Sequence, residues 1–217
     1  MVFGAIGLPI PQTRIVDVEA WTKKRLVENA KDYRPYMILV RVAGTLPQLQ
    51  QQAVLEDLSQ EKTPEPARSM AKDALRTIKR LGHPLELKFT ALDGRPTDLA
   101  SLKGKVVLID FWSTTCVPCV REMPDLKALY LKYKTQGFDV IGVTLDDDKE
   151  VLQRFIQTEQ LPWPQYFDPK GSQSPIAQEF AIRSIPVVWL VDRQGVLRDL
   201  NGREEQEKKI EALLKEH

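Results

Sequence analysis

The sequence predicts an α/β fold, with a central sheet between layers of helices, preceded by an α-helical N-terminal segment. Three observations lead to this prediction. After Gly82 the chain alternates between strand-like and helix-like stretches. Two of the strand-like stretches, 106–111 and 187–191, are apolar without polar alternation, so we expect both of their faces to be covered. Before Gly82, apolar residues recur at the spacing of helices.

The N-terminal segment, residues 1–81, is expected to be helical, with separate helices and loop breaks from Thr13 to Leu81. Further helices are predicted over 46–58 and, less regularly, over 16–31, and Pro64 and Pro66 mark a break before the last helix. The clearest helix places its apolar residues on one face: Ala67, Met70, Ala71, Ala74, Ile78 and Leu81. We interpret this segment as a packing module rather than a dedicated binding domain, and the sequence assigns it no role.

The second domain, residues 82–217, is predicted to carry the sheet. Its strands are expected at 85–92, 105–112, 138–145, 186–192 and 196–200. Its helices are expected at 116–135, 149–159, 175–180 and 204–215.

Composition excludes several classes of function. The 217 residues contain 31 Lys and Arg against 30 Asp and Glu, and a net charge of +1 favours neither nucleic acid nor an anionic membrane as a partner. No apolar run approaches the ~18 residues of a membrane span. The apolar stretch 2–10 lacks the flanking charge and cleavage site of an export signal, so none is expected. Without a glycine-rich phosphate loop, we expect no nicotinamide or flavin cofactor.

The only two cysteines, Cys116 and Cys119, follow a buried strand and open a helix. The unpaired N–H groups and the dipole of a helix N-terminus favour a thiolate at Cys116, which would make it a nucleophile near neutral pH. Cys119 lies one turn further on the same face, within reach of a mixed disulfide. Pro118 falls in the first turn, where its missing N–H costs nothing.

Other interpretations of the pair remain open. A structural zinc site would need further ligands, and the chain offers only His83 and His217. The cysteines could also be inert packing residues. A thiol peroxidase would carry the pattern Pro-x-x-x-Thr/Ser-x-x-Cys; Ser113 fits its hydroxyl position, but Ile109 stands where the proline belongs.

Four stretches occur together in a familiar order: LELKFTALDG (85–94), VVLIDFWSTTCVPCVREMP (106–124), FDVIGVTLD (138–146) and FAIRSIPVVWLVDRQG (180–195). From about Gly82 onward the chain resembles the TlpA/ResA-like redoxins (AhpC/TSA–TlpA type) of the thioredoxin superfamily. The resemblance implies a thioredoxin-like fold with a central mixed sheet and a helical insertion after the strand at 138–145. It has no counterpart for the N-terminal helices.

The resemblance also implies roles for single residues. Cys116 would be the attacking cysteine and Cys119 the resolving one. Pro186 would be a cis-proline facing them, with the backbone of Ile185 pairing with a substrate peptide.

Four further residues around the pair carry expectations. Asp110 matches a buried carboxylate that moves a proton in the resolving step, although it could simply be a satisfied polar residue. Glu122 matches a glutamate that tunes the cysteines, or is a solvated surface residue. Trp112 is expected to pack beside the site, and Pro124 to kink the helix.

Two departures from the family pattern matter. Thr115 replaces a tryptophan that often precedes the first cysteine, which leaves the shape of the substrate-facing surface open. Val117-Pro118 differs from the Gly-Pro pair of general thioredoxins, and because residues between the cysteines affect the redox potential, the direction of electron flow is open. Redox potentials in this superfamily span from about −270 to about −120 mV.

The sequence hypothesis is therefore a thiol-disulfide oxidoreductase that acts as a reductant. Its partners would be a protein disulfide substrate and a protein electron donor. Family resemblance favours the cell envelope, or periplasm, as its location. The alternatives are a redoxin-fold scaffold without turnover and a thiol peroxidase. Substrate identity and oligomeric state are not set by the sequence.

Overall fold

The computed structural model describes residues 33–44, 46 and 48–216. The stretch 2–10 and the helix expected over 16–31 lie outside the described residues. The chain divides into two compact units, 1–79 and 80–217.

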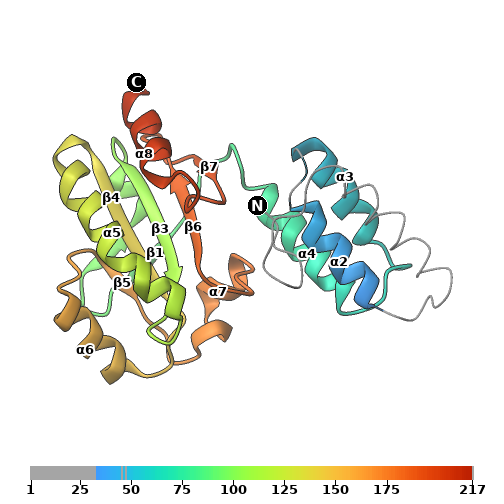
Figure 1. Cartoon of the computed structure of the whole chain (residues 1–217), viewed down its shortest axis with the longest axis horizontal. Helices are drawn as coiled ribbons and strands as arrows, with labels where there is room; N and C mark the ends of the chain where they lie inside the picture. Colours follow the sequence, from blue (N-terminus) through green and yellow to red (C-terminus); the bar gives the residue numbers. More distant parts are fainter. Residues whose placement is uncertain (1–32, 45, 47, 217) are drawn as a thin grey trace. The chain divides into compact units, whose positions relative to one another are not determined.

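Within residues 33–79, the first unit is helical (Figure 1). Its helices are α2 (Arg34–Ala43), α3 (Gln48–Leu58) and α4 (Ala67–Ile78). The helices bury apolar residues against one another, among them Leu39, Val42, Leu55, Leu58, Ala71 and Ile78. Sequence analysis did not predict α2, whose apolar run begins directly after Arg34-Pro35.

In the second unit, the described residues form a five-stranded sheet with the strand order β5-β4-β3-β6-β7. Its strands are β3 (Val106–Trp112), β4 (Phe138–Thr144), β5 (Gln165–Tyr166), β6 (Val187–Val191) and β7 (Leu197–Asp199). The central strand β3 pairs in parallel with β4 and antiparallel with β6, which confirms a mixed sheet. All seven residues of β3 are buried, as the unbroken apolar run predicts.

Helices cover both faces of this sheet (Figure 1). The α-helices are α5 (Val117–Tyr133), α6 (Lys149–Glu159), α7 (Pro175–Glu179) and α8 (Gln206–Lys215). Short 3₁₀ helices span Leu99–Leu102, Lys134–Gln136 and Gly171–Gln173. Successive residues of β3 point to opposite faces: Ile109 packs in the cluster with α7, whereas Leu108 packs in the cluster with α5, α6 and α8. Asp110 therefore shares a face with Leu108, towards α5 and α8.

The strand predicted over 85–92 was too long. Only β1 (Lys88–Thr90) forms, and it pairs with β2 (Pro96–Asp98) in a separate hairpin. Leu85 and Leu87 are buried in the α7-side cluster, but their backbones bond to loops: Leu85 N–H donates to Gly195 O, and Leu87 O accepts from Leu99 N–H. The alternating apolar residues thus correctly predicted that Leu85 and Leu87 are buried, but wrongly predicted that their backbones pair with a neighbouring strand.

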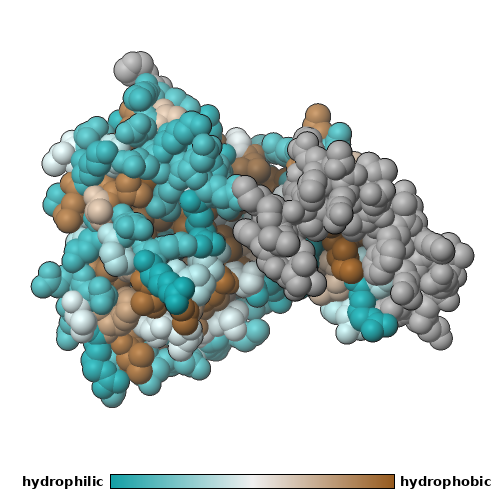
Figure 2. All heavy atoms as spheres, viewed as in Figure 1, coloured by the Kyte–Doolittle hydropathy of each residue, from teal (hydrophilic) through white to brown (hydrophobic). Residues whose placement is uncertain are grey.

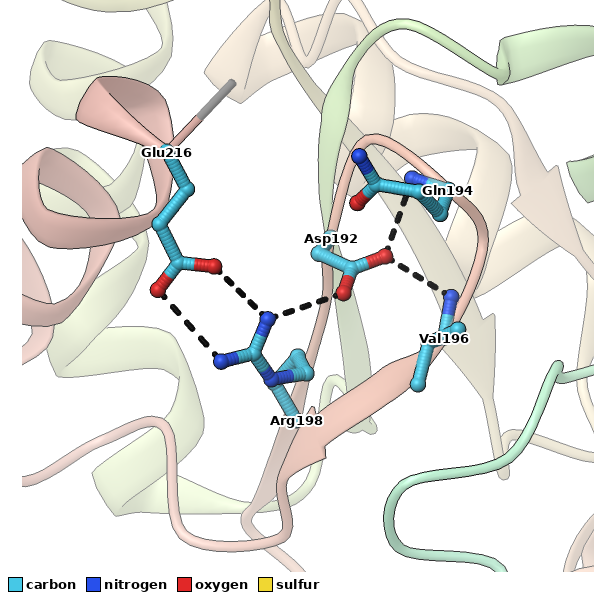
Figure 3. A network of polar contacts seen from close by, with 5 residues as sticks. All are labelled: Asp192, Gln194, Val196, Arg198 and Glu216. Atoms are coloured by element: carbon cyan, nitrogen blue, oxygen red, sulfur yellow. Dashed lines mark hydrogen bonds and ion pairs between the residues drawn. The ribbon is translucent and has the colours of Figure 1, made fainter.

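A buried carboxylate ties β6, β7 and the end of α8 together (Figure 3). Asp192 accepts hydrogen bonds from the backbone N–H groups of Gln194 and Val196, both at 2.9 Å. Arg198 bonds to Asp192 at 3.0 Å and to Glu216 at 2.7 Å. Elsewhere on this unit, Figure 2 shows hydrophilic side chains over most of the visible face, with hydrophobic ones in separate patches between them.

Candidate active site

The connection from β3 to α5 places the first cysteine at a helix N-terminus. Cys116 is the N-cap of α5 in an extended conformation, and its backbone N–H donates to Ser113 O at 3.1 Å. The Ser113 hydroxyl in turn bonds to the Thr115 hydroxyl at 2.8 Å. Cys116 therefore sits where the positive end of the α5 dipole favours negative charge on sulfur.

The two cysteines form a disulfide, with their Cα atoms 5.2 Å apart. Cys119 is buried and Cys116 is partly exposed. The Cys119 backbone N–H donates to Cys116 Sγ at 3.3 Å. This N–H is available because the N–H groups of a first helical turn have no acceptor within the helix. The neighbouring Val117 is 58% exposed, and Pro118, in the first turn, is exposed as well. An incoming molecule thus meets Cys116 first.

A buried aspartate that sequence reasoning missed fixes the loop before the cysteines. Asp146, just after β4, accepts hydrogen bonds from the Thr114 backbone N–H at 3.0 and 3.1 Å and from its hydroxyl at 2.6 Å. The Thr144 hydroxyl donates to the same carboxylate at 2.5 Å. Hydrogen bonds to a carboxylate are strong, so they fix the position of the loop that contains Thr114 relative to the end of β4.

Asp110 is a buried carboxylate on the α5 side of β3, 6% exposed. Burial raises the pKa of its carboxyl to about 7, the nearby Glu122 carboxylate adds to the rise, and the Arg203 guanidinium opposes it. A carboxyl with this pKa can both release and accept a proton near neutral pH.

Glu122, predicted either to tune the cysteines or to be a surface residue, is paired with Arg203. The Arg203 Nε donates to Glu122 Oε2 at 2.9 Å, and its Nη2 donates to Oε1. This pairing with Glu122 raises the pKa of Arg203. Sequence reasoning missed Arg203, which is 81 residues away and belongs to no motif.

Trp112 is the last residue of β3 and directly precedes the connection that carries the cysteines. It is fully buried, its ring lies 5.3 Å from that of Phe155, and its indole N–H donates to Gln165 Oε1 at 3.0 Å. The Gln165 amide lies directly over Gly142, where a Cβ would come within 1.8 Å of its oxygen. This close approach explains the glycine in β4.

The Ile185–Pro186 peptide bond is cis, the geometry that the resemblance implies. Both residues are partly buried. Ile185 packs against the clusters on both faces of the sheet, and Cys116 packs against the one that includes α5. The helix α5 continues through Pro124.

Three further observations describe metal-ligand groups, long apolar helices and cavities in the described residues. No group of three or more His, Cys, Asp and Glu side chains there is arranged to hold a metal ion. Within the same ranges, no helix has the length and apolar character needed to cross a membrane. Two cavities of about 220 and 210 Å³ lie beside Arg95 and Trp163, and neither is lined by a cysteine.

Comparisons with known proteins agree on the second unit. The profile of the AhpC/TSA family matches residues 82–200. The thiol-disulfide oxidoreductase ResA of Bacillus thuringiensis subsp. konkukian is 33% identical over 127 residues, which cover 58% of this chain and 72% of the relative.

Solved structures give the same picture. The thioredoxin domain of a thiol-disulfide oxidoreductase from Bacteroides vulgatus superposes with a TM-score of 0.54 at 28% identity, covering 62% of this chain and 97% of that one. A thiol-disulfide oxidoreductase from Bacteroides fragilis gives a TM-score of 0.52 at 27% identity, with 60% and 98% covered.

Proposed function

Since the chain belongs to the AhpC/TSA family, we propose that it is a thiol-disulfide oxidoreductase that exchanges electrons with protein disulfides through Cys116 and Cys119. The observation that carries the proposal is the disulfide at the start of α5, with one sulfur partly exposed and the other buried. Relatives named thiol-disulfide oxidoreductase ResA support the same chemistry. A reactive sulfur on an open surface, outside the two cavities beside Trp163, suits a protein substrate.

The first step is attack by the Cys116 thiolate on a substrate disulfide. A bond forms between Cys116 Sγ and one substrate sulfur, the substrate S–S bond breaks, and the other substrate sulfur leaves as a thiolate. The α5 N-terminus and the Cys119 N–H favour the attacking anion. Ile185, ahead of Pro186, offers its backbone to the substrate chain.

The second step releases the substrate. Cys119 gives its proton to Asp110 and attacks Cys116 Sγ, forming the internal disulfide and expelling the second substrate sulfur as a thiolate. The substrate gains two electrons and the cysteine pair loses two. A dithiol on another protein then restores the reduced pair.

We assign the pair a reducing role. A measured reduction potential should lie nearer to the about −270 mV of thioredoxin than to the about −120 mV of DsbA. A value at the DsbA end would reverse the direction of electron flow.

Insulin reduction with dithiothreitol as electron source tests the activity. The native chain should accelerate insulin precipitation, C116S should be inactive, and C119S should accumulate a mixed disulfide. A chain that binds partners without turnover would show no acceleration. If alkylation of the reduced protein at pH 7 depended on Cys119 rather than Cys116, the two roles would be exchanged.

Consumption of hydrogen peroxide separates the oxidoreductase from a thiol peroxidase. We expect little, because Ile109 occupies the proline position of that motif inside the fully paired strand β3. Proline there would remove a ladder N–H.

A further inference from the structure

Arg203 lies in the connection between β7 and α8, and Glu122 lies on α5. Two nitrogens of the Arg203 guanidinium donate hydrogen bonds to the Glu122 carboxylate. Fork-to-fork pairing of this kind fixes orientation as well as charge. The side chains of Arg203 and Glu122 are 33% and 49% exposed, so water screens the pair only in part.

The backbone before Arg203 is held against the sheet at the level of Asp110. Gly202 N–H donates to Val188 O at 2.8 Å, and Val188 is the residue of β6 that pairs with Asp110. A Cβ on Gly202 would lie 2.8 Å from Val188 Cγ1, so only glycine lets the chain approach this closely.

Further contacts fix the same connection from the α8 side. Lys209 Nζ donates to Asn201 O at 2.7 Å and pairs with Asp199 at 2.8 Å. Asp199 in turn accepts from the Asn201 N–H at 2.6 Å. The network around Asp192 in Figure 3 ties β7 to the end of α8. Because these contacts fix the backbone next to Arg203, its side chain can hold Glu122 in a defined position.

We propose that Arg203 is a positioning residue of the Cys116–Cys119 site, which holds the Glu122 carboxylate on α5 and offsets its negative charge beside Asp110. This inference rests on the proposed function, in which Asp110 accepts the proton of Cys119.

Among the described residues, the charges that act on Asp110 are those of Glu122 on α5 and of Arg203 in the β7–α8 connection. The neighbouring strands place Gly142 and Val188 beside Asp110, and neither titrates. Glu122 raises the pKa of Asp110 and Arg203 lowers it. Without Arg203, Glu122 would act unopposed.

The test is a ¹³C NMR titration of the Asp110 carboxyl in the oxidised full-length protein. The native midpoint should lie near 7, and R203Q should move it upward by about one pH unit. R203K keeps the charge without the fork and should give a smaller upward shift. E122Q should move the midpoint downward. R121Q is the matched control, since it removes an exposed cation from the same helix, next to Glu122.

An Asp110 midpoint that R203Q leaves unmoved, or moves no more than R121Q does, overturns the proposal. If R203Q does not fold, E122Q decides: a midpoint unchanged in E122Q shows that the pair does not act on Asp110. The titration needs no turnover, so it stands whether or not the protein reduces insulin. Failure of the insulin assay would refute the proposed function alone.

Discussion

Asp110 should make the stability of the oxidised protein fall as the pH rises. Its pKa is about 7 in the folded protein against an ordinary value of 3.8. Between these values the folded protein keeps a proton that the unfolded chain has released, so the free energy of unfolding declines with pH up to about 7 and stays low above it. The contribution is therefore complete below pH 3.8 and lost through pH 7.

The size of the effect follows from the same pKa values. A difference of about three pH units, at about 1.4 kcal/mol each, sets an upper limit of about 4 kcal/mol. Between pH 5 and pH 8, the free energy of unfolding should decrease by about 3 kcal/mol because of Asp110.

The variant D110N removes this dependence because its amide stays neutral. Urea unfolding of the oxidised native protein and of D110N, at pH values from 5 to 8, measures the difference between the two curves. We expect D110N to gain about 3 kcal/mol on the native protein across this range. D125N, an exposed carboxylate on the same helix as Glu122, should gain nothing comparable. Parallel curves for D110N and the native protein would refute the reasoning.

Three further predictions concern residues that hold the site in place. D146A should lower the free energy of unfolding by about 3 kcal/mol in urea, because Thr114 loses the acceptor of its N–H and hydroxyl, whereas D147A at the exposed neighbour should be nearly neutral; equal effects would count against a specific clamp. G202A should cost about 1–3 kcal/mol in thermal unfolding, since its Cβ overlaps Val188; unchanged stability would show that the connection yields freely. Q165L should cost about 1–3 kcal/mol in urea unfolding and alter tryptophan fluorescence, because the Trp112 N–H loses its acceptor; a native-like spectrum and stability would contradict this.

The sequence predicted the sheet strands that are apolar on both faces and the redox pair between β3 and α5. Both signals are local: a run such as 106–112 must be buried on both sides, and a Cys-x-x-Cys spacing brings two sulfurs to one helix face. Short strands were missed because their formation depends on residues elsewhere in the chain. The two-residue strand β5 and the hairpin strand β2 exist because longer neighbours offer them backbone partners, a property their own residues do not encode.

The polar side chains of the candidate site were predicted less completely. Asp110 and Glu122 were singled out by the family resemblance and their places relative to the CxxC motif, and their roles stay predictions. Asp146 had a weak signal, since it follows β4 at the same edge of the sheet that carries the cysteines. Arg203 had none, because its position depends on how closely Gly202 approaches β6.

In the proposed mechanism, burial of Asp110 has a direct consequence for the resolving step. A free thiol titrates near ~8.5, so passing its proton to a carboxyl with an ordinary pKa of 3.8 would be uphill by almost five pH units, about 6 kcal/mol. With the pKa of Asp110 at about 7, the gap shrinks to about 1.5 units, or about 2 kcal/mol. The carboxyl must not rise much further, because it would then stay protonated at neutral pH and could accept nothing. Glu122 pushes in that direction and Arg203 opposes it. In the proposed mechanism, the Glu122–Arg203 ion pair thus keeps the pKa of Asp110 in the range in which its carboxylate can accept the proton of Cys119.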